Sequence, residues 1–149
     1  MVVSLDHGLK DDVHPTIKYP IGHRLALLAL SNLYGYTSIE ARSPECRDLK
    51  CYPRSILLSF SGTSFLKTSN GDTLRGFEVV TLDGKSHSLT GEIKGNKVLL
   101  SLSASLVGQE LYQLRYAWHP YTDANLTGAT GLPVGTFSIN IPPRSYDSK

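Results

Sequence analysis

The chain has 149 residues, of which 40% are hydrophobic and 19% are charged, and its 15 basic and 13 acidic residues leave a net charge of +2. Such a composition is typical of a soluble globular chain, and it contains no cluster of Lys and Arg residues, so we expect no nucleic-acid partner and no membrane partner. The longest apolar run is far shorter than a membrane span, and the N-terminus lacks the pattern of a secretion signal.

The first 36 residues read as a strand, a polar loop and a helix. Residues 1–5, Met-Val-Val-Ser-Leu, form an apolar run of strand length. Pro20 suits the first turn of a helix, and Gly35 suits the left-handed position after its end. Residues 25–30 are apolar around the whole circumference, which is typical of a helix packed on several sides. We therefore expect a helix of roughly fifteen residues that needs a covering partner.

The loop between this strand and this helix contains an acidic pair and a His-Pro, at residues 11–15 (Asp-Asp-Val-His-Pro). Together with Arg24-Leu25-Ala26 in the helix and Tyr34-Gly35 at its end, the segment resembles the end of the catalytic domain of the sialate O-acetylesterase family. This family is a branch of the SGNH hydrolases. Its members commonly work in lysosomal, secreted or periplasmic settings.

The resemblance implies that His14 is the general base that takes a proton from a serine hydroxyl, since the hydroxyl is a poor nucleophile until a base removes its proton. Asp11 would orient the imidazole ring, with Asp12 as the rival for that role. The implied reaction removes O-acetyl groups from sialic acid or a related sugar and needs no metal and no cofactor. Without the resemblance, the same loop reads as a polar turn that caps a helix.

After Gly35 the sequence changes to short strands separated by turns, which is typical of an antiparallel β-sandwich. Asp83-Gly84 predicts a hairpin with a type I′ turn. The expected strands are residues 55–60, 76–82, 85–89, 97–102, 111–118 and 137–141. The resemblance continues through Gly76-Phe77-Glu78, Asp83-Gly84, Arg115-Tyr116-Ala117-Trp118, Asn125-Leu126, Gly131-Leu132-Pro133 and Phe137.

We therefore predict an α+β fragment: the terminal strand-loop-helix of an SGNH hydrolase domain (residues 1–36), a linker (37–54), a β-sandwich domain (55–141) and a flexible tail (142–149). The family's nucleophilic serine and oxyanion-hole residues stand well before the histidine, so the chain is expected to be a carboxyl-terminal piece that is inactive alone. Residues 71–74 (Gly-Asp-Thr-Leu) imitate a nucleophile block, but they follow the histidine and read as a turn.

The rival hypothesis is a non-catalytic β-sandwich module that binds carbohydrate or a partner chain, with the N-terminal helix as a docking element. Four aromatic residues on one expected strand and in the loop after it could either stack on a sugar ring or pack in the protein core, and packing in the core is favoured. These are Tyr112, Tyr116, Trp118 and Tyr121. No role is assigned to the remaining histidines, which are His7, His23, His87 and His119. Under either hypothesis the exposed helix predicts self-association.

Three further residues concern the compartment in which the chain folds. Cys46 and Cys51 are too few for a structural zinc site, and their spacing leaves a loop disulfide and two ordinary thiols equally open. Asn125 begins an Asn-Leu-Thr glycosylation sequon, which matters only in a secreted chain.

Overall fold

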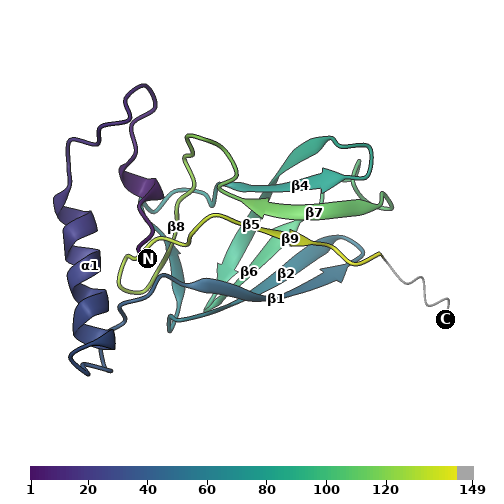
Figure 1. Ribbon diagram of the computed structural model, residues 1–149. Helices are drawn as coiled ribbons and strands as arrows, with labels where there is room; N and C mark the ends of the chain where they lie inside the picture. The colour runs from purple at the N-terminus through teal and green to yellow at the C-terminus, as the bar shows by residue number, and fades with distance from the viewer. Residues whose placement is uncertain (144–149) are drawn as a thin grey trace.

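The computed structural model describes residues 1–143, which are mostly antiparallel β-structure with one α-helix (Figure 1). A short 3-10 turn, η1 (Leu5–His7), precedes helix α1 (Tyr19–Asn32). Seven strands form one sheet in the order β1-β2-β6-β5-β4-β7-β9, and β3 pairs with β8. Their bounds are β1 Glu45–Tyr52, β2 Ser55–Ser61, β3 Leu66–Thr68, β4 Phe77–Thr81, β5 Ser86–Lys94, β6 Lys97–Ser101, β7 Leu111–Tyr116, β8 Leu126–Gly128 and β9 Phe137–Asn140.

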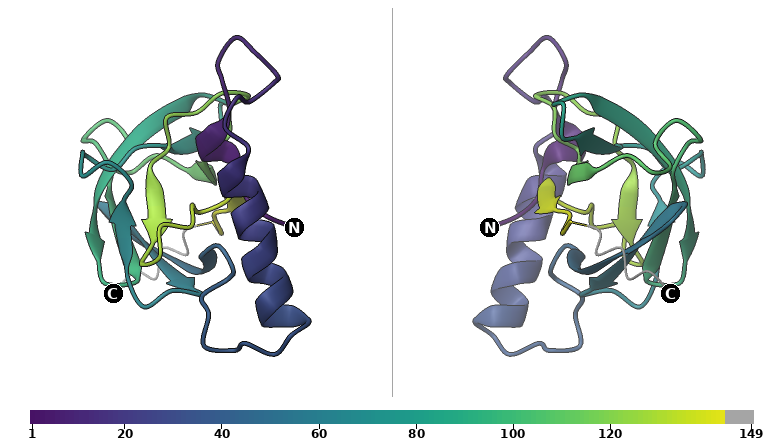
Figure 2. Two further views of the ribbon diagram at one scale, coloured as in Figure 1. Left: turned by 90° about the vertical axis from the view of Figure 1, so that its left-hand side faces the viewer. Right: turned by 90° about the vertical axis from the view of Figure 1, so that its right-hand side faces the viewer.

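The large sheet curls around its own interior (Figure 2). Strand β5 connects the two halves because its first part pairs with β4 and its last part pairs with β6. Gly91 lies just after the change of partner, and a Cβ there would stand 2.5 Å from the carbonyl oxygen of Leu99. The close approach of β6 therefore requires a glycine at this point of β5.

The core fills the inside of the curl with alternate residues of each strand, as the period of two in a half-buried strand requires. Four aromatic rings meet at its centre, those of Phe60, Phe77, Tyr116 and Phe137. The hydroxyl of Tyr116 accepts a hydrogen bond of 2.9 Å from the backbone N–H of Leu126, and burial raises the pKa of this phenol. A buried Tyr hydroxyl thus finds its partner on β8.

All six strand segments expected from the sequence form strands; five agree to within two residues at each end, and the one expected at 85–89 extends to residue 94 as β5. They join into a single curled sheet rather than two separate ones. The type I′ turn is wrong: Gly84 has a φ of 81°, but Asp83 does not have a positive φ. The turn is closed instead by the Gly84 N–H, which donates to the carbonyl oxygen of Thr81 at 2.9 Å.

The strand expected at residues 1–5 does not form; within residues 1–143 no strand pairs with the segment, which is irregular and ends in η1. The segment 37–54, expected as a linker, contains β1, whose polar edge-strand sequence hides the alternation. In the expected tail at 142–149, residues 144–149 lie outside the described residues.

Strand β1 also decides the state of the cysteines. Cys46 and Cys51 lie five residues apart along one strand, or about 16 Å at the rise of an extended chain, so they do not form a disulfide with each other. The sequon at Asn125 is buried: this side chain is only 3% exposed and donates through Nδ2 to the carbonyl oxygen of Thr73 at 3.0 Å. The folded chain therefore presents no acceptor amide for a glycan.

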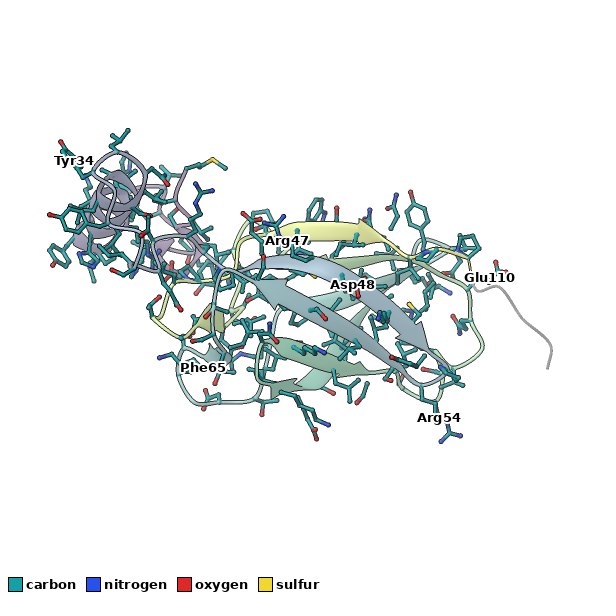
Figure 3. The ribbon with its side chains drawn as sticks, turned by 90° about the horizontal axis from the view of Figure 1, so that it is seen from below. Tyr34, Arg47, Asp48, Arg54, Phe65 and Glu110 are labelled. Carbon is teal, nitrogen blue, oxygen red and sulfur yellow. The ribbon has the colours of Figure 1, made fainter. Side chains whose placement is uncertain are left out.

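Helix α1 stands beside the β-structure with most of its surface uncovered (Figures 1 and 2). Leu25 is 52% exposed and Leu33 is 80% exposed, and Tyr34 points away from the strands at the end of the helix (Figure 3). Arg24 is the only buried residue of the helix. Among the described residues, no helix has the length and apolar character needed to cross a lipid bilayer.

Candidate functional site

His14 lies on the loop between η1 and α1, with its side chain 88% exposed. The carboxylate oxygen Oδ1 of Asp12 accepts a hydrogen bond of 2.8 Å from the backbone N–H of His14 and lies 3.2 Å from its ring Nδ1. A carboxylate held against Nδ1 fixes the tautomer that leaves Nε2 as a proton acceptor. Within residues 1–143, Nε2 of this exposed ring makes no hydrogen bond.

The carboxylate that orients this ring belongs to the residue expected as the rival. Asp11 makes no hydrogen bond to His14, whereas Asp12 makes two contacts with it. The reason is local, since an Asp side chain reaches the backbone N–H two residues ahead in a tight turn. The catalytic roles of His14 and Asp11 remain predictions.

No serine or threonine hydroxyl within residues 1–143 forms a hydrogen bond with His14. The imitation nucleophile block at residues 71–74 is a turn on the β-structure, as expected. In it the Asn70 amide donates to the Asp72 carboxylate at 2.9 Å, and Arg75 forms an ion pair with the same carboxylate at 3.7 Å. These contacts account for the polar residues of the block as turn chemistry.

An arginine-aspartate pair fixes the helix to the N-terminal segment. Arg24 donates two hydrogen bonds to the carboxylate of Asp6, at 2.8 and 2.6 Å, and a third to the carbonyl oxygen of Val3 at 2.7 Å. Burial alone raises the pKa of Asp6, but the hydrogen bonds and charge of Arg24 outweigh it, so this pKa is lowered. Leu5 packs against the β core next to Asp6. The pair therefore links α1 to the β-structure.

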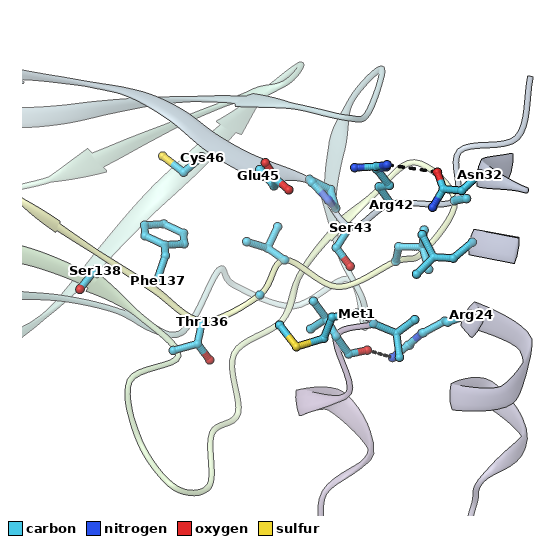
Figure 4. A pocket seen from close by; sticks show the side chains of 18 of the residues that line it. Met1, Arg24, Asn32, Arg42, Ser43, Glu45, Cys46, Thr136, Phe137 and Ser138 are labelled. Atoms are coloured by element: carbon cyan, nitrogen blue, oxygen red, sulfur yellow. Dashed lines mark hydrogen bonds between the residues drawn. The ribbon is translucent and has the colours of Figure 1, made fainter. Parts of the chain in front are cut away.

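A cavity of about 650 Å³ lies between α1 and the edge strands β1 and β9 (Figure 4). Arg24, Ser43 and Thr136 are among its lining residues, and Arg42 donates to the amide oxygen of Asn32 at 3.1 Å on its helix side. Cys46 lines the same cavity, but burial raises the pKa of its thiol to about 11. At neutral pH this cysteine is therefore a neutral thiol and not a nucleophile.

A second cavity, of about 670 Å³, lies beside the His-Pro loop and is lined by Asp11, Asp12 and Tyr121. A third, of about 660 Å³, lies on the outer face of β4 and is lined by Glu78, His119 and again Tyr121. Tyr121 stands between these two cavities. The cavity beside the N-terminal loop and the cavity on the β-structure therefore share a lining residue.

Sequence reasoning missed the pair that Glu78 and His119 form in this third cavity, with Oε2 of the carboxylate 3.1 Å from Nε2 of the ring. The two residues are 41 positions apart, and His119 had no assigned role. One signal was available, since Glu78 is a carboxylate in the middle of the apolar strand Phe-Glu-Val-Val, where burial requires a partner. Within residues 1–143 there is no group of His, Cys, Asp or Glu side chains suited to hold a metal ion.

Comparison with known proteins places this fold beside one class of enzyme. No family model matches the chain, and no curated protein matches it. Among solved structures, the chain is similar to a carbohydrate acetylesterase, with a TM-score of 0.84 and 31% sequence identity. That enzyme comes from Xanthomonas citri; the match covers 93% of the present chain and 32% of the acetylesterase. The chain thus spans about a third of the length of this structural relative.

Proposed function

We propose that the chain is the carboxyl-terminal part of a carbohydrate O-acetylesterase of the SGNH type, with His14 as its general base. The observation that carries this proposal is the exposed His14 ring, whose Nδ1 lies 3.2 Å from the carboxylate of Asp12 and whose Nε2 makes no hydrogen bond within residues 1–143. The similarity to a carbohydrate acetylesterase over nearly the whole chain supports it. The sequence resemblance further suggests acetylated sialic acid or a related sugar as the substrate.

The chemistry requires a serine hydroxyl, which the rest of the enzyme would supply. His14 takes the proton of that hydroxyl through Nε2 while the serine oxygen attacks the acetyl carbonyl carbon, and the imidazolium then returns the proton to the departing sugar oxygen. In the second half the same imidazole takes a proton from water, which attacks the acetyl-serine; the imidazolium returns the proton to the serine oxygen as its bond to the acetyl group breaks and acetic acid leaves. The carboxylate at Nδ1, which is that of Asp12, stabilises the imidazolium. Asp11 remains the alternative partner if the loop rearranges.

Helix α1 would meet the missing part of the hydrolase domain. Leu25 and Leu30 of the helix and Leu33 at its end are exposed, and a solvent-facing helix has no reason to carry these side chains together. Full burial of a leucine side chain contributes about 1.5–3 kcal/mol, so covering these three would stabilise the assembled domain by several kcal/mol. In isolation the same surface predicts self-association, which sedimentation at increasing concentration would detect.

Acetyl release tests the proposal. The chain alone should not hydrolyse an acetyl ester, because a base without a nucleophile and an oxyanion hole has nothing to acylate. A chimera in which the chain replaces the matching third of the Xanthomonas citri acetylesterase should hydrolyse acetylated sugars. Activity of the chain alone that disappears in His14→Ala would refute the fragment proposal. A folded chimera that is equally active with His14→Ala would refute the role of the histidine.

A second candidate function is carbohydrate binding by the β-structure without catalysis. The cavity around Glu78 and His119 favours it, because it contains charged side chains, hydroxyl groups and an exposed aromatic ring. The two functions are compatible, since a glycan-binding cavity beside an esterase loop would position the substrate.

A further inference from the structure

Glu78 occupies an unusual position in the middle of β4. Its neighbours Phe77 and Val79 point into the core, so Glu78 points to the outer face of the sheet, beside Ser88 on β5 and Arg115 on β7. The Glu78 side chain is nevertheless only 11% exposed. A nearly buried carboxylate is costly unless it is paired, so its partners and its remaining capacity decide what this site does.

The two carboxylate oxygens of Glu78 are used unequally. Oε2 accepts a hydrogen bond of 2.8 Å from the Ser86 hydroxyl and lies 3.1 Å from Nε2 of His119. Oε1 has only the guanidinium of Arg115, whose Nη1 is 3.8 Å away and thus beyond hydrogen-bond length. A carboxylate oxygen can accept two hydrogen bonds, so Oε1 retains acceptor capacity on a residue that lines the cavity.

The loop after β7 forms the other side of the cavity and is held in place by the backbone. Ala117 ends β7 with a φ of 52°, the one non-glycine residue with a positive φ in the described part of the chain, and its N–H donates to the carbonyl oxygen of Gly76 at 2.9 Å. A side chain at Gly76 would collide with Ala124, 2.4 Å from its Cβ. The strained and closely packed backbone thus fixes the loop that carries His119 and Tyr121 over β4.

The cavity combines three kinds of group. Arg75 is held by Asp123 at 3.1 Å and presents a fixed guanidinium, and Ser88 and Thr90 line the cavity with hydroxyl groups. Tyr121 is half exposed and presents an aromatic face. Carboxylate and guanidinium groups bind neighbouring hydroxyl groups in pairs, and an aromatic face packs against apolar C–H groups. A volume of about 660 Å³ lies within the usual range for a small-ligand site.

We infer that this cavity binds a neutral pyranose unit of a glycan, with a sugar hydroxyl donating to Oε1 of Glu78 and the sugar ring packing on Tyr121. An acidic sugar is excluded, because its carboxylate would stand beside the carboxylates of Glu78 and Asp123. The two nearby arginines, Arg115 and Arg75, are already paired with these carboxylates and do not offer a free positive charge to the sugar. Tyr121 also lines the cavity that Asp11 and Asp12 of the His-Pro loop border, so the bound unit would lie beside this loop and could help to place a glycan for deacetylation. Only this last relation rests on the proposed function.

Amide chemical shifts of the whole chain, titrated with cellotetraose, mannotetraose and the acidic trigalacturonate, test the inference. At millimolar concentration at least one neutral oligosaccharide should shift the amides of β4, of the start of β5 and of the loop around Tyr121. Trigalacturonate should leave them unchanged. Shifts centred on β1 and β2, no shifts with either neutral sugar, or equal shifts with trigalacturonate would overturn the proposal.

Two variants and two matched controls locate the site. Glu78→Gln and Tyr121→Ala should each weaken binding about tenfold or more, because the first replaces a charged acceptor with a weaker amide acceptor and the second removes the aromatic ring. Tyr52→Ala and Glu92→Gln, which alter exposed residues of β1 and β5, should bind as the wild type does. Tyr121→Ala changes a surface ring and keeps the core, so unchanged affinity in this variant refutes the site even if Glu78→Gln fails to fold. Binding that persists while the chimeric esterase is inactive would refute the proposed function alone.

Discussion

Replacement of Asp6 by Asn should release helix α1 from the β-structure. The substitution keeps the shape of the side chain but removes the charge that holds Arg24, which is only 7% exposed. The guanidinium then retains the carbonyl oxygen of Val3 and a neutral amide oxygen, and a nearly buried positive charge loses its counter-ion.

The magnitude follows from the two hydrogen bonds of 2.8 and 2.6 Å. Hydrogen bonds to charged groups contribute about 1.5–3 kcal/mol each, but the Asp6 side chain is 27% exposed and Asn can still accept one of them. We therefore expect a loss of about 2 kcal/mol, which is about thirtyfold in the equilibrium for local opening. A detached helix of 14 residues is marginal in water, so it should fray.

Amide hydrogen exchange of residues 23–32 measures this directly, because local opening exposes these amides without unfolding the strands. The Asp6→Asn variant should exchange about thirtyfold faster in the helix, with the exchange of β2 and β6 unchanged. Asp48→Asn is the matched control, since this aspartate on β1 is exposed and pairs only with Lys50 at 3.9 Å. Helix protection that is equal in Asp6→Asn and wild type would refute the link between α1 and the β-structure.

Three further predictions concern stability and modification. Gly76→Ala should lower the free energy of unfolding in urea by about 3 kcal/mol, because Gly76 has a φ of 101° and a Cβ there would collide with Ala124. Gly84→Ala should lower it by only about 1 kcal/mol, because Gly84 has a φ of 81° but lies in open space; equal losses in the two variants would contradict the close packing at Gly76. The protection of α1 from hydrogen exchange that Asp6 provides should be complete above about pH 4. It should disappear as the pH falls through the lowered pKa of Asp6, because protonation removes the negative charge that holds Arg24. A difference in helix protection between wild type and Asp6→Asn that stays constant down to pH 2 would contradict this. Mass spectrometry of the folded chain secreted from a glycosylating host should find Asn125 unmodified, because a glycan added before folding would keep this side chain from its buried place against Thr73. A glycan on correctly folded protein would contradict the burial of Asn125.

The sequence predicts most of the regular structure because local rules determine it. The helix at 19–32 follows from Pro20 and the apolar run after it, and strands such as residues 55–61 alternate cleanly between buried and half-buried positions. Strand β1 was not predicted because its sequence lacks the apolar alternation that identifies a strand. As an edge strand it can carry charged residues such as Arg47 and Asp48, which point outward (Figure 3). The type I′ turn failed because Asp83 tolerates a positive φ without needing one.

The sites are less accessible to sequence reasoning because their contacts join distant residues. Arg24 and Asp6 are 18 positions apart, and the spacing gives no reason to pair them. The sequence predicts a polar loop at residues 11–15, but whether Asp11 or Asp12 contacts His14 depends on turn geometry that only the structure shows. Tyr121 was weighed as a core residue, whereas the structure leaves it half exposed between two cavities.

The most direct test of the account is the rate of acetyl release by the chimeric esterase with His14→Ala, measured beside His23→Ala. His23 is an exposed histidine of α1 with no part in the proposed mechanism, so it controls for loss of an imidazole near the loop. The account predicts that His14→Ala lowers kcat/KM about a thousandfold while His23→Ala leaves it near the parent value. Equal rates in the two variants, with both chimeras folded, would contradict it.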